Sequence, residues 1–248
     1  MARSFALGLR RSEQDEFYCW NPSLEKAKNL ASELGGVVVQ AELPKVDVVI
    51  LGFKPQKLST ASSELEAALK EQNPIILSLL AAVETAALKP AFPHKKILRV
   101  MPNLPVKDGA GVVLWHKGEL SVSESGYWQK RFDAMGLSAE MSEKDIDLYT
   151  LHAGCSPAFL YAWIDAAADF AVKNGGDSEL AKRILIQAWS GTVQGLAQGT
   201  LDMQARIEAV ASKGGVTRAA LDGFALNPTY IQDGFAAGLK RIAELKGH

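Results

Sequence analysis

The sequence is poor in cysteine and has no excess of charge of either sign. Its 248 residues include two cysteines, Cys19 and Cys155, and 27 basic against 28 acidic side chains, a formal net charge of −1. Two cysteines cannot build a disulfide framework or a cysteine-rich metal site, and a reducing, cytoplasmic setting is the default for such a chain. A net charge near zero gives no electrostatic case for binding nucleic acid or an anionic membrane surface. We therefore expect no nucleic-acid partner and no bound metal.

Long apolar runs are also absent. The best run, Pro74–Val83, ends at Glu84 and is much shorter than the ~20 residues that a membrane-spanning helix needs. The arginines at the N-terminus are followed directly by Glu13, Asp15 and Glu16, which disfavours a targeting segment. The apolar share of 48% and the charged share of 22% are those of an ordinary globular chain that can bury a core. The sequence thus predicts a globular protein without a membrane span.

Short apolar runs alternate with helical patterns through about residue 140. The runs of strand length are Phe17–Trp20, Val37–Val39, Val46–Phe53, Pro74–Leu79 and Lys96–Val100. Val46–Phe53 is apolar almost throughout, which suits a strand that is buried on both faces of a parallel sheet. The segments with helical spacing are Leu24–Leu34, with Asn21 as its expected N-cap, Leu58–Glu71 and Ala82–Ala91. This alternation predicts a doubly wound α/β domain over residues 1–142.

Residues 143–248 have a different pattern. Four segments are rich in Ala and Leu at helical spacing and are separated by glycines: Asp145–Asn174, Asp177–Gln198, Asp202–Lys213 and Val216–Lys246. No strand-like alternation is convincing there, so we predict an all-helical second domain over residues 143–248. Long amphipathic helices of this kind need a partner to cover them, and a homodimer or larger homo-oligomer is therefore expected.

The sequence also lacks the glycine-rich turn that a dinucleotide-binding domain normally carries after its first strand. No G-x-G-x-x-G occurs, and the chain opens on a helical pattern in which Ala2, Phe5, Ala6 and Leu9 share one face. Phe17–Trp20 would then be the second strand, which ends at the ribose. Without a first strand, the second and fourth strands must pair directly, or buried backbone groups stay unpaired at a cost of ~1–3 kcal/mol each. We expect direct pairing or a filled gap, and a weakened cofactor site.

Four motifs resemble those of pyrroline-5-carboxylate reductases. RVMPNLP (Arg99–Pro105) is similar to the family's RVMPNTP, and VVILGFKPQ (Val48–Gln56) is similar to its VVILAVKPQ. AGCSPAF (Ala153–Phe159) resembles SGSGPAY, and SKGGVT (Ser212–Thr217) resembles SPGGTT. The order and spacing of all four fit, and the similarity extends over essentially the whole chain. Any one motif alone would be a weak signal, whereas four in register are specific.

The resemblance implies a Rossmann-like parallel sheet domain that lacks its first strand, followed by an all-helical dimerisation domain. The family's first motif ends in G-x-G-N-M-A, and Met1-Ala2 matches its last two residues. The chain is therefore similar to a family member that begins inside its own phosphate loop. Two explanations stay open: a start codon chosen too far downstream, and a truncated relative.

The resemblance also implies an activity, namely hydride transfer from a reduced nicotinamide to the carbon of a cyclic imine. The product is L-proline, in the last step of its biosynthesis. Thr217 matches the family's catalytic threonine near the imine nitrogen, and Ser212 matches the serine that helps to bind the substrate carboxylate. The implied substrate-binding residues are Ser212, Gly214, Gly215, Val216 and Thr217. The implied cofactor-binding residues are Asn21, Gly52, Phe53, Lys54, Pro55, Ala81, Ala82 and Asn103.

Simpler interpretations exist for the same residues when the family is left aside. Gly214-Gly215 is then a helix breaker flanked by capping hydroxyls, and Lys54 is a solvated lysine. Asn103 and Pro105 then belong to an ordinary turn. On the residues alone, the helix breaker is the preferred interpretation of Gly214-Gly215, and the simpler interpretations of Lys54 and Asn103 match the functional ones evenly. Only the resemblance favours substrate and cofactor sites at these positions.

Several residues depart from the family pattern. Pro22 stands where many relatives have an arginine for the NADP 2′-phosphate, and no acidic residue follows Trp20 for an NAD ribose, so neither cofactor signature is present. The resemblance implies NADP, and NAD stays open as the alternative. Leu104, Ala153 and Cys155 replace hydroxyl-bearing residues. These losses keep two other functions open. One is a catalytically impaired, truncated relative that acts as a dimeric non-enzyme, and the other is a reductase of another small imine.

Overall fold

The structure, a computed structural model, describes residues 1–40, 42–197, 202–224 and 228–246. The chain forms two compact units, one of Met1–Ser156 with Gly238–His248 and the other of Pro157–Ala237. The first is an α/β unit, and the second is helical wherever it is described. The predicted class, a sheet domain followed by helices, is confirmed. None of the helices in the described ranges has both the length and the apolar character that crossing a membrane requires.

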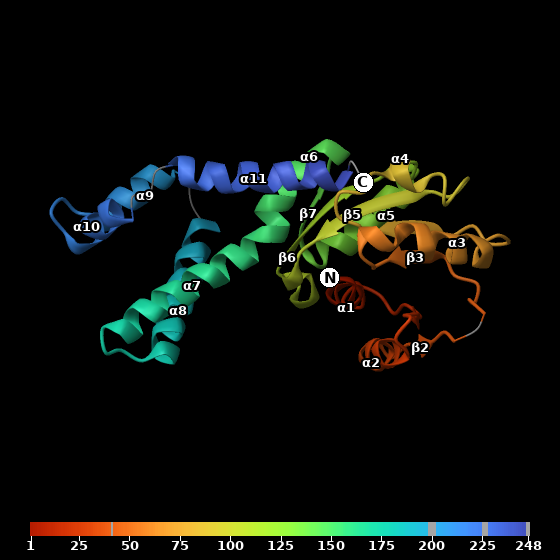
Figure 1. Ribbon diagram of the computed structural model, residues 1–248, viewed down its shortest axis with the longest axis horizontal. Coiled ribbons are helices and arrows are strands. Elements are labelled where there is room, and N and C mark those ends of the chain that lie inside the picture. Colours follow the sequence, from red (N-terminus) through yellow and green to blue (C-terminus); the bar gives the residue numbers. More distant parts are fainter. Residues whose placement is uncertain (41, 198–201, 225–227, 247–248) are drawn as a thin grey trace. The chain divides into compact units, whose positions relative to one another are not determined.

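Five strands form the main sheet of the α/β unit, in the order β3-β4-β5-β6-β7 (Figure 1). They are β3 (Val48–Leu51), β4 (Ile75–Ser78), β5 (Ile97–Pro102), β6 (Gly111–His116) and β7 (Gly136–Glu140). The first three are parallel, as their apolar sequences predict. β6 runs antiparallel to β5, and β7 runs parallel to β6. The sequence analysis missed β6 and β7, because the pairing of β6 to β5 and of β7 to β6 depends on contacts between distant residues.

A second sheet contains only β1 (Tyr18–Cys19) and β2 (Val37–Val38), which are parallel. β1 and β3 belong to different sheets, so the expected direct pairing of these two strands is wrong. Phe17, next to β1, packs with Val48 and Ile50 of β3 against the same apolar core. Side-chain burial, rather than a shared backbone ladder, therefore connects the two sheets.

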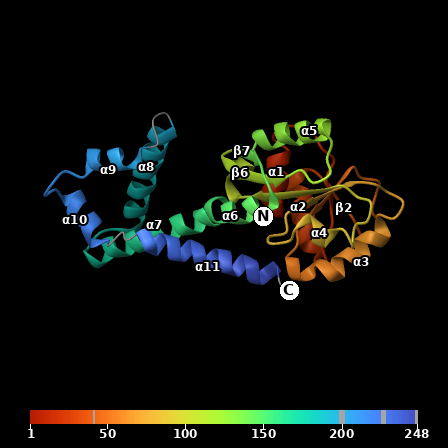
Figure 2. The same ribbon diagram turned by 90° about the horizontal axis from the view of Figure 1, so that it is seen from above.

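Helices cover both faces of the main sheet (Figure 2). The helices of this unit are α1 (Ala2–Leu9), α2 (Leu24–Leu34), α3 (Leu58–Ala68), α4 (Thr85–Leu88), α5 (Val122–Asp133) and α6 (Glu143–Thr150), with the 3-10 turns η1 (Pro55–Lys57) and η2 (Leu104–Asp108). Phe5 of α1 and Phe132 of α5 lie in the core on one face, together with Leu77 of β4. Ile76, the preceding residue of β4, lies in the core on the other face with Leu88 of α4. This alternation is typical of a sheet that is buried on both sides.

Three helices of this unit differ from the sequence prediction at their ends, and one of them is α3, which ends at Ala68 rather than at Glu71. Ser23, not Asn21, is the N-cap residue of α2, and the side-chain oxygen of Asn21 instead accepts a hydrogen bond from the Ser23 amide at 2.9 Å. The predicted helix Ala82–Ala91 is shortened to α4, because Ala82 has a φ of 59°, which a right-handed helix cannot contain. The predicted end of α2 is confirmed, since Gly35 terminates it in the left-handed conformation.

The helical unit contains long antiparallel segments. Its helices are α7 (Ser156–Lys173), α8 (Ser178–Ala197), α9 (Met203–Val210), α10 (Val216–Gly223) and the first part of α11 (Pro228–Lys246). The single helix predicted over Val216–Lys246 is instead α10 and α11, and residues 225–227 lie outside the described residues. The ring of Trp163 lies 5.0 Å from that of Trp189 and 5.7 Å from that of Phe224, measured between centroids. These aromatic contacts link α7, α8 and the end of α10.

Candidate functional site

The carboxyl ends of β3, β4 and β5 share one edge of the main sheet, because the three strands are parallel. Ligands of open α/β sheets bind outside this edge. The predicted cofactor residues that follow these strands are Gly52, Phe53, Lys54 and Pro55 after β3, Ala81 and Ala82 after β4, and Asn103 after β5. The fold therefore brings seven of the eight predicted cofactor residues to one edge.

The N-terminus of α1 lies at the same edge. A Cβ atom added to Gly52 would come within 2.5 Å of the Cβ of Ala2, so glycine is needed for this close approach. The first hydrogen bond of the helix runs from the Phe5 amide to the Met1 carbonyl, at 3.0 Å. The preceding amides have no partner within the helix, and its first turn contains no acidic side chain. Such a helix end attracts anions, including phosphate groups.

The turn after β3 presents one charged side chain. Lys54 is exposed, whereas Phe53 is half-buried against the core that includes α3. Pro55 starts the 3-10 turn η1. This turn therefore offers a positive charge beside the α1 end, on a backbone that is fixed by the burial of Phe53.

The turn after β4 is strained. Ala82 is buried, and its positive φ lies in a region that non-glycine residues seldom adopt. Ser78, at the end of β4, is also buried, and its hydroxyl accepts a hydrogen bond from the Leu80 amide at 3.3 Å. Strain of this kind is concentrated at functional sites, which agrees with the position of Ala82 on the ligand-binding edge.

Both polar groups of the Asn103 side chain form hydrogen bonds within the protein. Its oxygen accepts a hydrogen bond from the Val112 amide at 2.8 Å, and its nitrogen donates to the Ala153 carbonyl at 3.2 Å. Ala153 belongs to η3 (Leu151–Cys155), a π-helical turn between α6 and α7. Asn103 therefore connects β6 and η3 to the carboxyl edge of the sheet.

Asn21 is the predicted cofactor residue that the main sheet does not carry. It is exposed and follows β1, which belongs to the separate two-stranded sheet. Its side chain already bonds the Ser23 amide. The segment Trp20–Ser23 contains neither an acidic nor a basic residue.

The predicted substrate residues lie in the helical unit, in the turn that leads into α10. Gly214 has a φ of 73°, and the Gly215 amide donates to the Ser212 carbonyl at 3.0 Å. A Cβ atom on Gly215 would lie 2.6 Å from the Ser212 hydroxyl, so this glycine admits the hydroxyl to the start of the helix. The first hydrogen bond of α10, from the Ala219 amide to the Gly215 carbonyl, leaves the amides of the first turn without helical partners. This turn can bind a carboxylate, and Thr217 exposes its side chain there.

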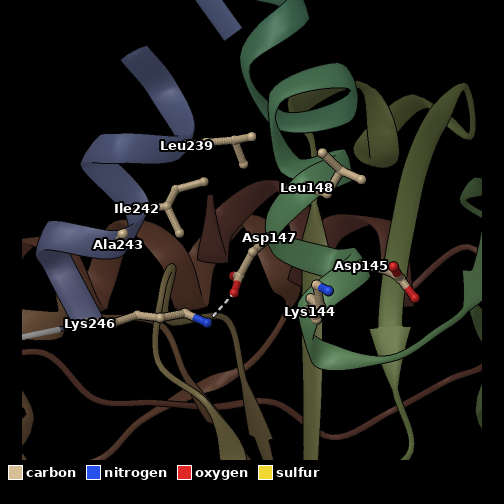
Figure 3. Close-up of a pocket in the computed structure, with 8 residues that line it drawn as sticks. All are labelled: Lys144, Asp145, Asp147, Leu148, Leu239, Ile242, Ala243 and Lys246. Carbon is tan, nitrogen blue, oxygen red and sulfur yellow. Dashed lines mark ion pairs between the residues drawn. The ribbon is translucent and has the colours of Figure 1, made fainter. Parts of the chain in front are cut away.

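The sequence analysis missed a buried ionic cluster in the α/β unit. Arg99 of β5 is 1% exposed and donates to a carboxylate oxygen of Asp147 at 2.6 Å. The second oxygen of Asp147 lies 2.5 Å from the Lys246 ammonium (Figure 3). The same ammonium also pairs with Glu84. An arginine within an otherwise apolar strand was the available signal, because a buried guanidinium needs acidic partners.

A shallow pocket of about 300 Å³ lies next to this cluster, between α6 and α11. Its lining residues are Lys144, Asp145, Asp147, Leu148, Leu239, Ile242, Ala243 and Lys246 (Figure 3). None of them is a predicted site residue. Two of the charged groups at its wall, those of Asp147 and Lys246, pair with each other in the ionic cluster.

The remaining reactive side chains do not form a second centre. Burial raises the pKa of the thiols of Cys19 and Cys155, which lowers their reactivity as nucleophiles. Among the residues that the structure describes, no group of three or more His, Cys, Asp or Glu side chains could hold a metal ion.

Comparison with protein families gives two matches along the chain. Residues 143–245 match the family described as pyrroline-5-carboxylate reductase dimerisation. Residues 1–82 match the family described as NADP oxidoreductase, coenzyme F420-dependent. Together the two matches leave only residues 83–142 and 246–248 of the chain uncovered.

Individual relatives give the same picture. Pyrroline-5-carboxylate reductase of Aquifex aeolicus is 31% identical over 222 residues, which cover 88% of this chain and 82% of that protein. The enzyme of that name from Pseudomonas aeruginosa is 27% identical over 256 residues, or 99% and 93% of the two chains. The crystal structure of 1-pyrroline-5-carboxylate reductase from Streptococcus pyogenes has a TM-score of 0.81 and 25% identity, and the match covers 100% of this chain and 96% of that one. A Plasmodium falciparum pyrroline carboxylate reductase with NADP bound shares the fold, with a TM-score of 0.81, 21% identity, and coverage of 98% of this chain and 92% of that one.

The identity to the Aquifex protein extends over most of both chains, and the four motifs fall where the fold places the sheet edge, η3 and the turn before α10. The chain therefore belongs to the pyrroline-5-carboxylate reductase family.

Proposed function

We propose that this chain reduces the cyclic imine 1-pyrroline-5-carboxylate to L-proline with a reduced nicotinamide cofactor. One observation carries the proposal: a member of this family has retained both an anion-attracting helix end at the sheet edge and a Ser-Lys-Gly-Gly-Val-Thr turn before α10. The first feature suits the phosphates of a dinucleotide, and the second suits a small carboxylate substrate.

The turn before α10 is proposed to bind the substrate. The carboxylate of the imine would accept hydrogen bonds from the free amides of Val216 and Thr217 and from the Ser212 hydroxyl. The Thr217 hydroxyl is exposed beside these amides, so it can orient the imine nitrogen and hold a proton for it. We propose Thr217 as the catalytic residue and Ser212, Gly214, Gly215 and Val216 as substrate-binding residues.

The edge of the main sheet is proposed to bind the cofactor, which supplies the hydride. The close approach of Gly52 to Ala2 places the α1 end at this edge, Met1 before it is exposed, and Lys54 follows Gly52 by two residues with an exposed positive charge. Phe53, Pro55, Ala81 and Ala82 complete the proposed edge. Asn103 follows β5 at the same edge with its side chain bonded within the protein, and Asn21 lies at the end of β1. We propose NADP rather than NAD, because the segment after β1 has no carboxylate that would repel a 2′-phosphate.

The helical part is proposed to pair with a second copy of the chain. Its large apolar side chains are exposed in a single copy, and its sequence matches a dimerisation family. We propose that residues 1–142 bind the cofactor and that residues 143–248 bind the substrate and dimerise. A cytoplasmic location is proposed as well, since neither cysteine is in a disulfide.

The test is the consumption of NADPH by the purified chain with 1-pyrroline-5-carboxylate as the acceptor. We expect turnover within the ordinary enzyme range, ~1–10³ s⁻¹. Thr217→Val should lower kcat/KM by about tenfold or more, since it removes one hydrogen bond to the reacting substrate. Thr192→Val is the matched control, because the exposed Thr192 hydroxyl donates to the Ala188 carbonyl of its own helix. Equal activity of both variants would exclude the role of Thr217.

The separation of β1 from β3 favours a second candidate function, that of a dimer that binds no dinucleotide. NADPH titration followed by cofactor fluorescence separates the candidates. An engineered variant with a strand and a G-x-G-N turn attached before Met1 is the comparison. If only the extended variant binds NADPH, the second candidate holds for the 248-residue chain.

A further inference from the structure

One face of β5 and the residue that follows it contact α6 and η3 at three successive points. Side chains two residues apart share a face of a strand, so Arg99, Met101 and Asn103 point in the same direction. Arg99 bonds Asp147 of α6, and Met101 packs in a core cluster with Ile146. Asn103 donates to the Ala153 carbonyl. The strand thus holds α6 and η3 by an ion pair, an apolar contact and an amide hydrogen bond.

The Ala153 carbonyl has a specific need for this donor. In a regular α-helix it would accept from the amide four residues later, but that residue is Pro157, which has no N–H group. A buried carbonyl without a partner costs free energy. The side-chain nitrogen of Asn103, itself 6% exposed, supplies the missing donor at 3.2 Å.

A glycine of α11, Gly238, packs closely against the same turn. A Cβ atom on Gly238 of α11 would come within 2.5 Å of the Leu151 side chain, so Leu151, the first residue of η3, is enclosed by close packing. η3 is therefore held from two directions within the α/β unit. π-Helical turns in helices are frequent at functional sites, which is where this one lies.

We propose that Asn103 is a positioning residue that holds η3 in its π-helical register beside the carboxyl edge of the sheet. Its bond to Ala153 places Gly154, Cys155 and Ser156 next to the end of β5, at the edge of the sheet that is proposed to bind the cofactor. The consequence for catalysis rests on the proposed function, whereas the coupling between Asn103 and Pro157 does not.

The decisive variant is Asn103→Asp, which keeps an acceptor for the Val112 amide but removes the donor to Ala153. We expect amide hydrogen exchange in the segment 151–156, measured by mass spectrometry, to become about tenfold faster, as loss of one buried hydrogen bond implies. Asn174→Asp is the matched control, because the side-chain amide of Asn174 donates to the Phe170 carbonyl at 2.8 Å in the exposed turn that follows α7. Unchanged exchange in Asn103→Asp, or equal acceleration in both variants, would overturn the proposal.

A second substitution tests the reason for the contact. Pro157→Ala supplies the N–H group that the Ala153 carbonyl lacks, so the exchange effect of Asn103→Asp should shrink to less than about threefold in that background. An undiminished effect would overturn the coupling. If Asn103→Asp alone does not fold, a folded double variant supports the proposal and an unfolded one contradicts it.

Kinetics separate positioning from direct cofactor binding. We expect Asn103→Asp to lower kcat by about tenfold or more, while the NADPH dissociation constant changes by less than about threefold. A tenfold weaker NADPH affinity with unchanged exchange would instead make Asn103 a direct ligand. If the wild-type chain shows no turnover, the proposed function fails, and the exchange experiments still decide the role of Asn103.

Discussion

The two units of this chain bury apolar surface in different ways. In the α/β unit, helices on both faces of the sheet cover residues such as Phe5, Leu77 and Trp115 completely. In the helical unit, only Ala168 and Ala211 are buried among its described residues. Its large apolar side chains that are between 49% and 89% exposed include Phe159, Tyr161, Phe170, Ile184, Val193 and Val216.

This difference shows which unit can be stable by itself. Burial of apolar surface contributes roughly 25 cal/mol per Å², and the α/β unit obtains it within one chain. Paired helices without a third layer cannot bury their apolar faces within one chain, so these faces must pack against another surface. Because the helical residues match a dimerisation family, a second copy of the chain is the expected cover.

The largest effect should come from charging the exposed face of the helical unit. We expect the double variant Phe170→Asp/Ile184→Asp to abolish dimerisation, because each copy would place two unpaired carboxylates in an apolar interface. Sedimentation velocity measures the change. Val122→Asp is the control, since Val122 is 89% exposed at the start of α5 in the α/β unit. A double variant that remains dimeric would show that these helices are covered in another way.

The next largest effect is expected on the stability of the α/β unit, at its buried ionic cluster. Asp147→Ala leaves the buried Arg99 guanidinium without its closest partner and should lower the free energy of unfolding by roughly 3–5 kcal/mol. Asp145→Ala, on the same helix, is the control, since it removes only a contact with the Ser142 cap and should cost about 1 kcal/mol or less. Urea denaturation monitored by circular dichroism measures both. Equal losses would exclude a special role for the buried pair.

A smaller, pH-dependent effect is expected at the start of α5. The pKa of Glu124 is lowered to about 2, mainly by its hydrogen bond with Lys96 and also by the capping box with Ser121. A lowered pKa in the folded state stabilises the protein above the unfolded value of 4.5, and this contribution is lost as the pH falls towards 2.

Glu124→Gln should therefore be less stable than wild type at neutral pH, by roughly 1 kcal/mol for the weakened cap, and about equal to it near pH 2. Urea unfolding across this pH range tests the expectation. Glu66→Gln, on the exposed surface of α3, serves as the control and should show no such convergence. A stability gap that is independent of pH would contradict the assignment.

The smallest effect is a gain in stability. Ala82→Gly should raise the free energy of unfolding by about 0.5–1 kcal/mol, because glycine adopts the positive φ of this position without steric cost. Ala87→Gly in α4 is the matched control and should lower it by a similar amount. Calorimetric Tm values measure both changes. A loss of stability in Ala82→Gly would mean that its buried methyl group matters more than its backbone conformation.

The sequence by itself determined the features that depend on neighbouring residues. β3, β4 and β5 follow from apolar runs, and the end of α2 follows from Gly35, whose conformation only glycine adopts readily. The turn before α10 was found in the same way, since Gly214 and Gly215 mark it in the sequence. The family also followed from the sequence, because four short motifs in a fixed order are a local signal.

Only the tertiary structure decided the features that depend on distant partners. The antiparallel β6 and the added β7 are fixed by pairing to strands already in the sheet. β1 and β3 lie in separate sheets, and only the side chain of Phe17, next to β1, packs on the core that β3 helps to form. The Arg99 cluster and the contact of Asn103 with Ala153 join residues about 50 positions apart. The spacing of apolar residues along the sequence does not indicate such partners. The free energy of a buried charge or carbonyl depends on which groups the fold brings to it.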